Sequence, residues 1–229
     1  MGNGENRMLI RFEDYNGAEG QFIANYPVLW EELSQVLEAM PLHLKASDQA
    51  GIQGKSIFDP VGTNEFIKSK LSSKGWRANI PIPKQFDFLG TDIDFGKSGV
   101  LVEAQFSNYP FLLNNTLRSE LFYKAEIPLG GEPTEVVVII TKAHMFPASN
   151  STLYFEQAHN QLTELFRYNV FDVPIRLVGL FERLGEKVDS VFTEYENPRY
   201  SRTVVERNEV PCTIHRGRSS KSRCNIVLG

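Results

Sequence analysis

The segment that most restricts the fold is EVVVIIT, residues 135–141, a near-continuous apolar run with polar residues only at its two ends. A strand with one solvent-exposed face would alternate apolar and polar residues, so this run is typical of a strand covered on both faces. PIRLVGLF, residues 174–181, has a similar pattern. The two segments predict buried strands at the centre of a sheet.

Four other segments have apolar residues at three- and four-residue spacings, which is typical of helices that bury one stripe. They are residues 27–40, 64–74, 111–124 and 153–168, and the apolar positions of the third are Leu113, Leu117 and Leu121. Residues 86–95 and 100–106 are rich in β-branched and aromatic side chains and are joined by GKSG, so they predict two antiparallel strands with a turn. We therefore predict an α/β fold with a mixed central sheet flanked by helices.

Length and composition predict one sizeable domain. The chain has 229 residues, of which 41% are hydrophobic and 23% charged, as in ordinary soluble globular proteins. Although the formal net charge is -4, the region from residue 199 to the end has seven basic residues (Arg199, Arg202, Arg207, Arg216, Arg218, Lys221, Arg223) against two acidic ones (Glu206, Glu209). That asymmetry predicts either a polyanion-binding arm or a solvated tail, and we expect the segment from about residue 204 to be flexible.

Several kinds of protein are excluded by what the sequence lacks. No stretch approaches the roughly 18 uninterrupted apolar residues of a membrane span, and MGNGENRMLIRF lacks the apolar core of a secretory signal. We therefore expect no membrane contact and a cytoplasmic location. GKS occurs twice, but Gln49 and Thr91 stand where a P-loop needs glycine. Cys212, His215 and Cys224 offer three zinc ligands without a fourth at a suitable spacing.

A small group of polar side chains marks the strand pair at residues 92–106. Side chains alternate across a strand, so Glu103 and Gln105 share one face, and the turn brings Asp94 back toward them. Two carboxylates held close together repel each other unless a cation neutralises them, and magnesium is a hard ion that prefers oxygen ligands. The pattern marks a candidate magnesium site at one end of a buried sheet. A solvated strand edge is the alternative.

Long blocks of sequence between about Trp30 and Thr203 carry a resemblance to a known family. They are MPLHLKASDQA, IFDPVGTNEFIK, IPIPKQFDFLGTDIDFGK, LVEAQFSNYPFLLNNTLRSELF, ITKAHMFPASNSTLYFEQAHNQL, YNVFDVPIRLVGL and RYSRT. Together they resemble the BglII type of type II restriction endonuclease, in the PD-(D/E)xK nuclease superfamily. The N-terminal segment and the region beyond Thr203 match less well. The resemblance implies a restriction-endonuclease-like core and a single catalytic and DNA-binding domain over residues 1–229.

The resemblance also implies which residues act. Asp94 and Glu103 would hold Mg²⁺ with the backbone carbonyl of Ala104, and Asn79 would lie near the site. Gln105 stands where most relatives of the superfamily have lysine. Members of the family with glutamine there are active, so this departure does not predict an inactive enzyme. An amide can orient a water molecule, however, and cannot supply a positive charge.

The implied reaction is hydrolysis of a DNA phosphodiester by in-line attack of water, assisted by magnesium, which leaves a 5'-phosphate and a 3'-hydroxyl. Side chains that reach the base edges and phosphates give specificity. By resemblance these are Ser107, Asn108, Asn150, Ser151, Tyr200 and Arg202. Asn150 and Ser151 also suit the start of the helix that follows, because Asn and Ser are favoured N-caps.

The family's target is a six-base palindrome centred on GATC, here expected to be AGATCT-like, cut to leave 5' overhangs. A palindrome requires a twofold partner, so the resemblance implies a homodimer on double-stranded DNA. It also implies a cognate DNA methyltransferase that protects the same sites. A sequence-specific DNA-binding protein on this scaffold that has lost cleavage is the alternative function.

Overall fold

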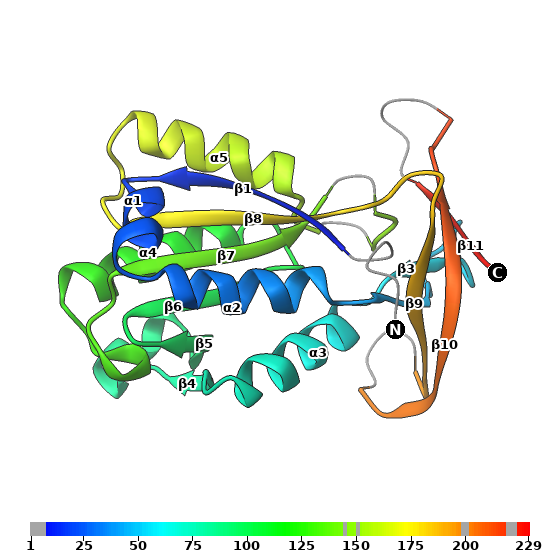
Figure 1. Ribbon diagram of the computed structural model, residues 1–229, viewed down its shortest axis with the longest axis horizontal. Coiled ribbons are helices and arrows are strands. Elements are labelled where there is room, and N and C mark those ends of the chain that lie inside the picture. Colours follow the sequence, from blue (N-terminus) through cyan, green and yellow to red (C-terminus); the bar gives the residue numbers. More distant parts are fainter. Residues whose placement is uncertain (1–7, 144–145, 150–151, 198–201, 219–223) are drawn as a thin grey trace.

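The computed structural model describes residues 8–143, 146–149, 152–197, 202–218 and 224–229, which form two sheets with helices packed on the larger one (Figure 1). The strands are β1 (Leu9–Tyr15), β2 (Leu42–Ala46), β3 (Ser56–Phe58), β4 (Arg77–Pro81), β5 (Asp92–Lys97), β6 (Val100–Ala104), β7 (Val136–Lys142), β8 (Ile175–Phe181), β9 (Lys187–Tyr195), β10 (Val204–His215) and β11 (Asn225–Leu228). The helices are α1 (Ala18–Ala24), α2 (Pro27–Glu38), α3 (Pro60–Ser73), α4 (Phe111–Lys124) and α5 (Phe155–Arg167), with short 3-10 turns η1 (Lys84–Leu89) and η2 (Leu129–Gly131).

The larger sheet has the strand order β1-β8-β7-β6-β5-β4. Its central strands β6, β7 and β8 run parallel, whereas β1, β5 and β4 join antiparallel to their neighbours. The apolar run that predicted a doubly covered strand is β7, in which every residue is buried. The prediction of an α/β fold with a mixed central sheet is confirmed.

Helices cover both faces of this sheet. On one face, α1, α2 and α3 pack against a core that includes Val138 and Val178. On the other face, α4 and α5 pack against a core that includes Ile139 and Leu177. Successive residues of β7 and β8 therefore enter different cores, which explains why both strands are continuous apolar runs in the sequence.

Two regions differ from the pattern-based expectation. Residues 86–89, predicted as the start of a strand, lie in η1, and β5 begins only at Asp92. Proline cannot donate to a strand ladder, and Pro83 precedes η1 while Gly90 ends it with a φ of 129°. Near the N-terminus, where apolar spacing gave no prediction, residues 9–15 form β1 along the edge of β8.

The smaller sheet, with the order β11-β10-β9-β2-β3, was not predicted. We expected a flexible segment from about residue 204, whereas in the structure residues 204–215 form β10, which pairs with β9 on one side and β11 on the other. None of the helices in the described residues combines the length and the apolar character that crossing a membrane requires.

A buried carboxylate joins this smaller sheet to α3. Asp59 Oδ1 accepts a hydrogen bond from the Val61 N–H at the start of α3 (3.1 Å), and Oδ2 accepts one from the Tyr195 hydroxyl at the end of β9 (2.7 Å). Asp59 is fully buried, and burial raises its pKa while the bond from Tyr195 opposes that rise. One side chain therefore fixes both the first turn of α3 and the position of that helix against β9.

We predict that Tyr195→Phe lowers the free energy of unfolding by about 1–2 kcal/mol, because the buried Asp59 carboxylate loses a donor while the ring still fills its place. Urea denaturation measures the change. Tyr168→Phe is the matched control, since Tyr168 is 70% exposed, and it should change stability by less than about 0.5 kcal/mol. Equal values for the two variants would contradict this account.

Candidate active site

The antiparallel pairing of β5 and β6 brings the two predicted carboxylates together. Phe95 is paired with Val102, so at the next position Asp94 and Glu103 lie opposite each other. Glu103 is buried near the end of β6, and Asp94 is half-buried near the start of β5. The fold therefore places Asp94 and Glu103 next to each other, as the sequence pattern predicted.

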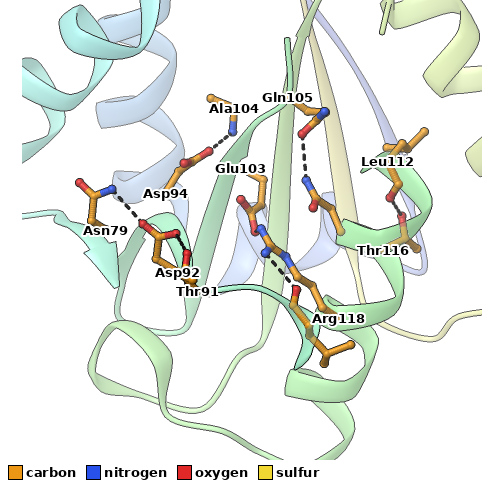
Figure 2. A network of polar contacts seen from close by, with 12 residues as sticks. Asn79, Thr91, Asp92, Asp94, Glu103, Ala104, Gln105, Leu112, Thr116 and Arg118 are labelled. Carbon is orange, nitrogen blue, oxygen red and sulfur yellow. Dashed lines mark hydrogen bonds and ion pairs between the residues drawn. The ribbon is translucent and has the colours of Figure 1, made fainter. Parts of the chain in front are cut away.

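Asp94 faces a cavity of about 460 Å³. The wall of the cavity is formed by Pro60, Val61, Asn64, Glu65, Lys68, Asn79, Asp94, Phe95, Ala104, Phe106, Ser107 and Arg202. Asp94 Oδ2 accepts a hydrogen bond of 2.7 Å from the Ala104 N–H (Figure 2). Burial raises the pKa of Asp94, and the bond from Ala104 and the charge of Arg118 oppose that rise. Asp94 is a partly buried carboxylate with access to a ligand.

Glu103 lies outside the cavity wall and forms an ion pair with Arg118 of α4 (Figure 2). Only 4% of the Glu103 side chain and 10% of the Arg118 side chain are exposed. Burial raises the pKa of Glu103 and the Asp94 charge adds to that rise, whereas the charge and the hydrogen bond of Arg118 lower it. Arg118 is therefore the group that favours an ionised Glu103 beside Asp94.

Gln105 also lies outside the cavity wall, and its amide is fully engaged. Nε2 donates to Ser107 Oγ at 3.0 Å and to the Asn108 carbonyl at 3.3 Å, and Oε1 accepts from Asn115 Nδ2 of α4 at 3.3 Å. The side chain is 8% exposed. In this structure Gln105 ties the segment after β6 to α4.

Asn79 lies across from Asp94, because the residues on either side of Asn79 pair with those on either side of Asp94. Its φ of 51° is in the left-handed region, which Asn tolerates better than most residues. The side chain accepts a hydrogen bond from the Lys68 ammonium and donates one of 3.0 Å to Asp92 Oδ2, whose other oxygen accepts from the Thr91 hydroxyl at 2.8 Å. Asn79 thus links a lysine of α3 to the start of β5.

Of the predicted DNA contacts, Ser107, Asn108 and Arg202 are described. Ser107 and Arg202 line the cavity beside Asp94, and Asn108 forms an antiparallel bridge with Thr152. Asn150, Ser151 and Tyr200 lie outside the described residues. Two of the three described residues therefore lie in the same cavity wall as Asp94.

A buried ammonium group holds together the chain before Ser107 and the chain at Thr152. Lys142, at the end of β7, is fully buried and donates to the carbonyl of Phe106 at 3.1 Å and to the hydroxyl of Thr152. The Thr152 hydroxyl in turn donates to the Phe106 carbonyl at 2.6 Å. The ammonium lies 5.2–5.8 Å from the ring centroids of Phe58, Phe106 and Tyr154. These bonds and the surrounding rings fix the chain before Ser107 against the chain at Thr152.

Sequence reasoning missed Arg118 and Lys68, and it chose the wrong face of α4. Apolar spacing selected the stripe of Leu113 and Leu117, yet these side chains are 42% and 57% exposed. The buried face instead includes Asn115, Thr116, Arg118 and Ser119, which lie under the strand ends. These polar residues recur at helical spacing soon after the carboxylate motif, and that pattern could have indicated a buried polar face.

The oxygen donors at this place fit a hard divalent cation. Within the described ranges no three His, Cys, Asp or Glu side chains converge on one point, and the predicted ligands Asp94 and Glu103 form a pair of carboxylates across β5 and β6. Magnesium commonly uses one or two carboxylates and keeps several waters. A cation there would also relieve the Asp94 charge that contributes to the raised pKa of Glu103.

Comparison with known proteins gives concordant matches. A family model described as restriction endonuclease BglII/BglIII matches residues 10–180. The type II restriction enzyme BglII of Bacillus subtilis is 61% identical over 203 residues, which are 89% of this chain and 90% of that protein. The crystal structure of restriction endonuclease BglII complexed with a DNA 16-mer superposes with a TM-score of 0.93 at 56% identity, and covers 97% of this chain and 100% of that one. Free BglII superposes with a TM-score of 0.76 at 54% identity and the same coverage. The predicted restriction-endonuclease-like core is confirmed.

We predict that Arg118→Met lowers the free energy of unfolding by about 3 kcal/mol at pH 7, because it leaves the Glu103 carboxyl buried without its charge partner. Glu103→Gln combined with Arg118→Met should restore part of this loss, since no buried charge then remains. Urea denaturation of the single and double variants completes a double-mutant cycle. Additive losses in the double variant would show that the two side chains are not energetically coupled.

Proposed function

Because this chain belongs to the BglII/BglIII restriction endonuclease family and is a type II site-specific DNA endonuclease, we propose that its target is a GATC-centred palindrome in double-stranded DNA. The proposed site is AGATCT-like, and cleavage is magnesium-dependent and leaves 5'-phosphates on 5' overhangs. Residues 1–229 act as one catalytic and DNA-binding domain in the cytoplasm. A cognate methyltransferase that modifies the same sites would protect the host DNA.

The observation that carries this proposal is the position of Asp94 in the cavity wall, with Glu103 opposite it at the strand ends. A cavity of about 460 Å³ gives a phosphodiester access to Asp94. Ser107 and Arg202 line the same cavity and provide a hydroxyl and a guanidinium for the DNA backbone or base edges. The carboxylate of Asp94, the amide of Asn79 and the guanidinium of Arg202 thus line one cavity.

The reaction we propose adds water to phosphorus and breaks the bond between phosphorus and the 3' oxygen. The water loses a proton, the 3' oxygen takes one up, and a 5'-phosphate and a 3'-hydroxyl result. When bound, magnesium supplies charge neutralisation at the phosphate and lowers the pKa of a bound water. Asp94, Glu103 and the Ala104 carbonyl would hold the ion, and Arg118 orients Glu103 from below.

Asn79 and Gln105 have supporting roles in this proposal. Asn79 lies across from Asp94, so its amide would help to position the phosphate or the water in the cavity. Gln105 holds the chain at Ser107 and Asn108 to α4, which places two predicted DNA contacts beside the reacting bond. Asn150, Ser151, Tyr200 and Arg202 would complete the contacts to bases and phosphates.

We propose a homodimer, because a palindrome is read by two copies related by a twofold axis. The exposed apolar side of α4 supports this proposal. Phe111, Leu113 and Leu117 are 49%, 42% and 57% exposed, and Tyr109 just before the helix is 46% exposed. A second copy that covers this stripe would explain why its apolar side faces outward.

The proposed chemistry predicts that Asp94→Asn lowers the single-turnover cleavage rate by at least about 10³-fold, because the amide cannot hold the cation that stabilises developing charge. Binding of a duplex that contains AGATCT should persist or tighten, since one negative charge facing the phosphate is removed. A plasmid nicking assay and a gel-shift assay measure the two effects. EDTA should abolish cleavage by the unaltered protein and leave binding in place.

Asp172→Asn is the matched control, because Asp172 is 60% exposed and pairs with Lys124 away from the cavity. It should cut at the unaltered rate. Cleavage by Asp94→Asn at a comparable rate would contradict the assignment of the site. Tight binding by the unaltered protein with no cutting at any magnesium concentration would favour the binding-only alternative.

The proposed dimer predicts that Leu113→Glu combined with Leu117→Glu shifts the protein toward monomer, because two charges would be buried in the apolar contact. Sedimentation velocity measures the change. Val205→Glu is a control at an apolar residue of β10 that is 59% exposed, and it should leave the dimer intact. A double variant that remains dimeric would exclude α4 as the contact.

A further inference from the structure

The cleavage chemistry proposed above increases the negative charge around the phosphate, and enzymes stabilise such charge with fixed cations. Gln105 stands at the position where a lysine would supply one, and its amide is committed to Ser107, Asn108 and Asn115. Arg118 is beneath the strands and is paired with Glu103. Neither Gln105 nor Arg118 therefore places a positive charge in the cavity wall.

Two cationic side chains among the described residues do line the cavity, Lys68 and Arg202. Arg202 follows the segment of residues 198–201 and was predicted as a DNA contact. Lys68 belongs to α3 and was not predicted to have a role. The ammonium of Lys68 donates to Asn79 Oδ1, and Asn79 lies across from Asp94 in the β4–β5 pair. Only the Asn79 side chain therefore connects the Lys68 ammonium to the strand position opposite Asp94, the carboxylate at which we propose cleavage.

The fold holds Lys68 in this place. Next to Lys68 on α3, Ile67 and Leu71 are fully buried in the core, which fixes the rotation of the helix. The Asp59 carboxylate caps the first turn and anchors it to β9. Lys68 itself is exposed toward the opening. An ammonium has three N–H donors and Asn79 accepts from one of them, so the others can reach a phosphate oxygen.

We propose that Lys68 is a catalytic residue that contacts a non-bridging oxygen of the scissile phosphate and supplies, from α3, the positive charge that Gln105 does not provide from β6. Asn79 acts as the positioning residue that orients its ammonium. The inference rests on the proposed endonuclease function and assigns a further group to that same site.

The test separates cleavage from binding. The full-length protein is assayed on a duplex that contains AGATCT, with magnesium for single-turnover rates at saturating enzyme and without divalent metal for affinity. Lys68→Gln should lower the single-turnover rate by about 10²–10³-fold, as loss of one preorganised donor does elsewhere. Affinity should fall by less than about tenfold, because one phosphate contact of several is lost. Lys68→Arg, which keeps the charge, should cleave faster than Lys68→Gln.

Lys70→Gln is the matched control. Lys70 lies two residues along the same helix, is exposed, and its ammonium is 5.6 Å from the centroid of the Phe66 ring outside the cavity wall. It should cleave at the unaltered rate. Retained binding by Lys68→Gln also shows that this variant is folded.

Two outcomes would overturn the inference. One is a saturated rate for Lys68→Gln within about threefold of the unaltered protein, a change of less than 1 kcal/mol in the barrier. The other is a loss of affinity that accounts for the whole effect, which would make Lys68 a binding contact. Failure of the unaltered protein to cut would overturn the proposed function itself, and is recognised before any variant is compared.

Discussion

The buried ion pair between Glu103 and Arg118 is the interaction on which the architecture of the site depends. A carboxylate that is almost fully buried is costly unless a partner compensates its charge, and Arg118 is that partner. To supply it, α4 turns a polar face toward the sheet and exposes the apolar side chains of Leu113 and Leu117. The ion pair holds Glu103 buried against α4, while Asp94, opposite it in the β5–β6 pair, lies in the cavity wall.

Around this pair, side chains from distant parts of the sequence meet at one end of the central sheet. α3 contributes Lys68, β4 contributes Asn79, β5 contributes Asp94, and the chain after β6 contributes Ser107. Their relative positions depend on two buried polar connections, the Asp59–Tyr195 hydrogen bond and the bonds that Lys142 makes to Phe106 and Thr152. The residues that make these two connections lie outside the cavity wall, apart from Phe106, yet they fix α3 and the chain before Ser107, which line the cavity. Rigid support of this kind is what a site for in-line phosphate chemistry requires.

Several of these features could be predicted from the sequence, and the rest could not for identifiable reasons. The strands β7 and β8 and the opposition of Asp94 and Glu103 follow from periodicity and a short turn, which are local properties. The aromatic residues of the segment 86–89 predict a strand, but Pro83 and Gly90 on either side of it favour a turn. The β9–β11 region was missed because its strands are largely polar and do not form a continuous apolar run like that of β7. Arg118 was missed because a helical apolar stripe is ordinarily the buried one, and here it faces outward.

We propose that the protein cleaves DNA at one defined sequence and that the reaction takes place at Asp94. The most direct test of this proposal is to incubate unmethylated plasmid DNA with the purified protein and magnesium and to sequence the fragment ends. We predict that every end falls in one GATC-centred palindrome, of the AGATCT type, with a 5' overhang and a 5'-phosphate. Ends scattered over unrelated sequences, or plasmid that stays intact, would contradict the account.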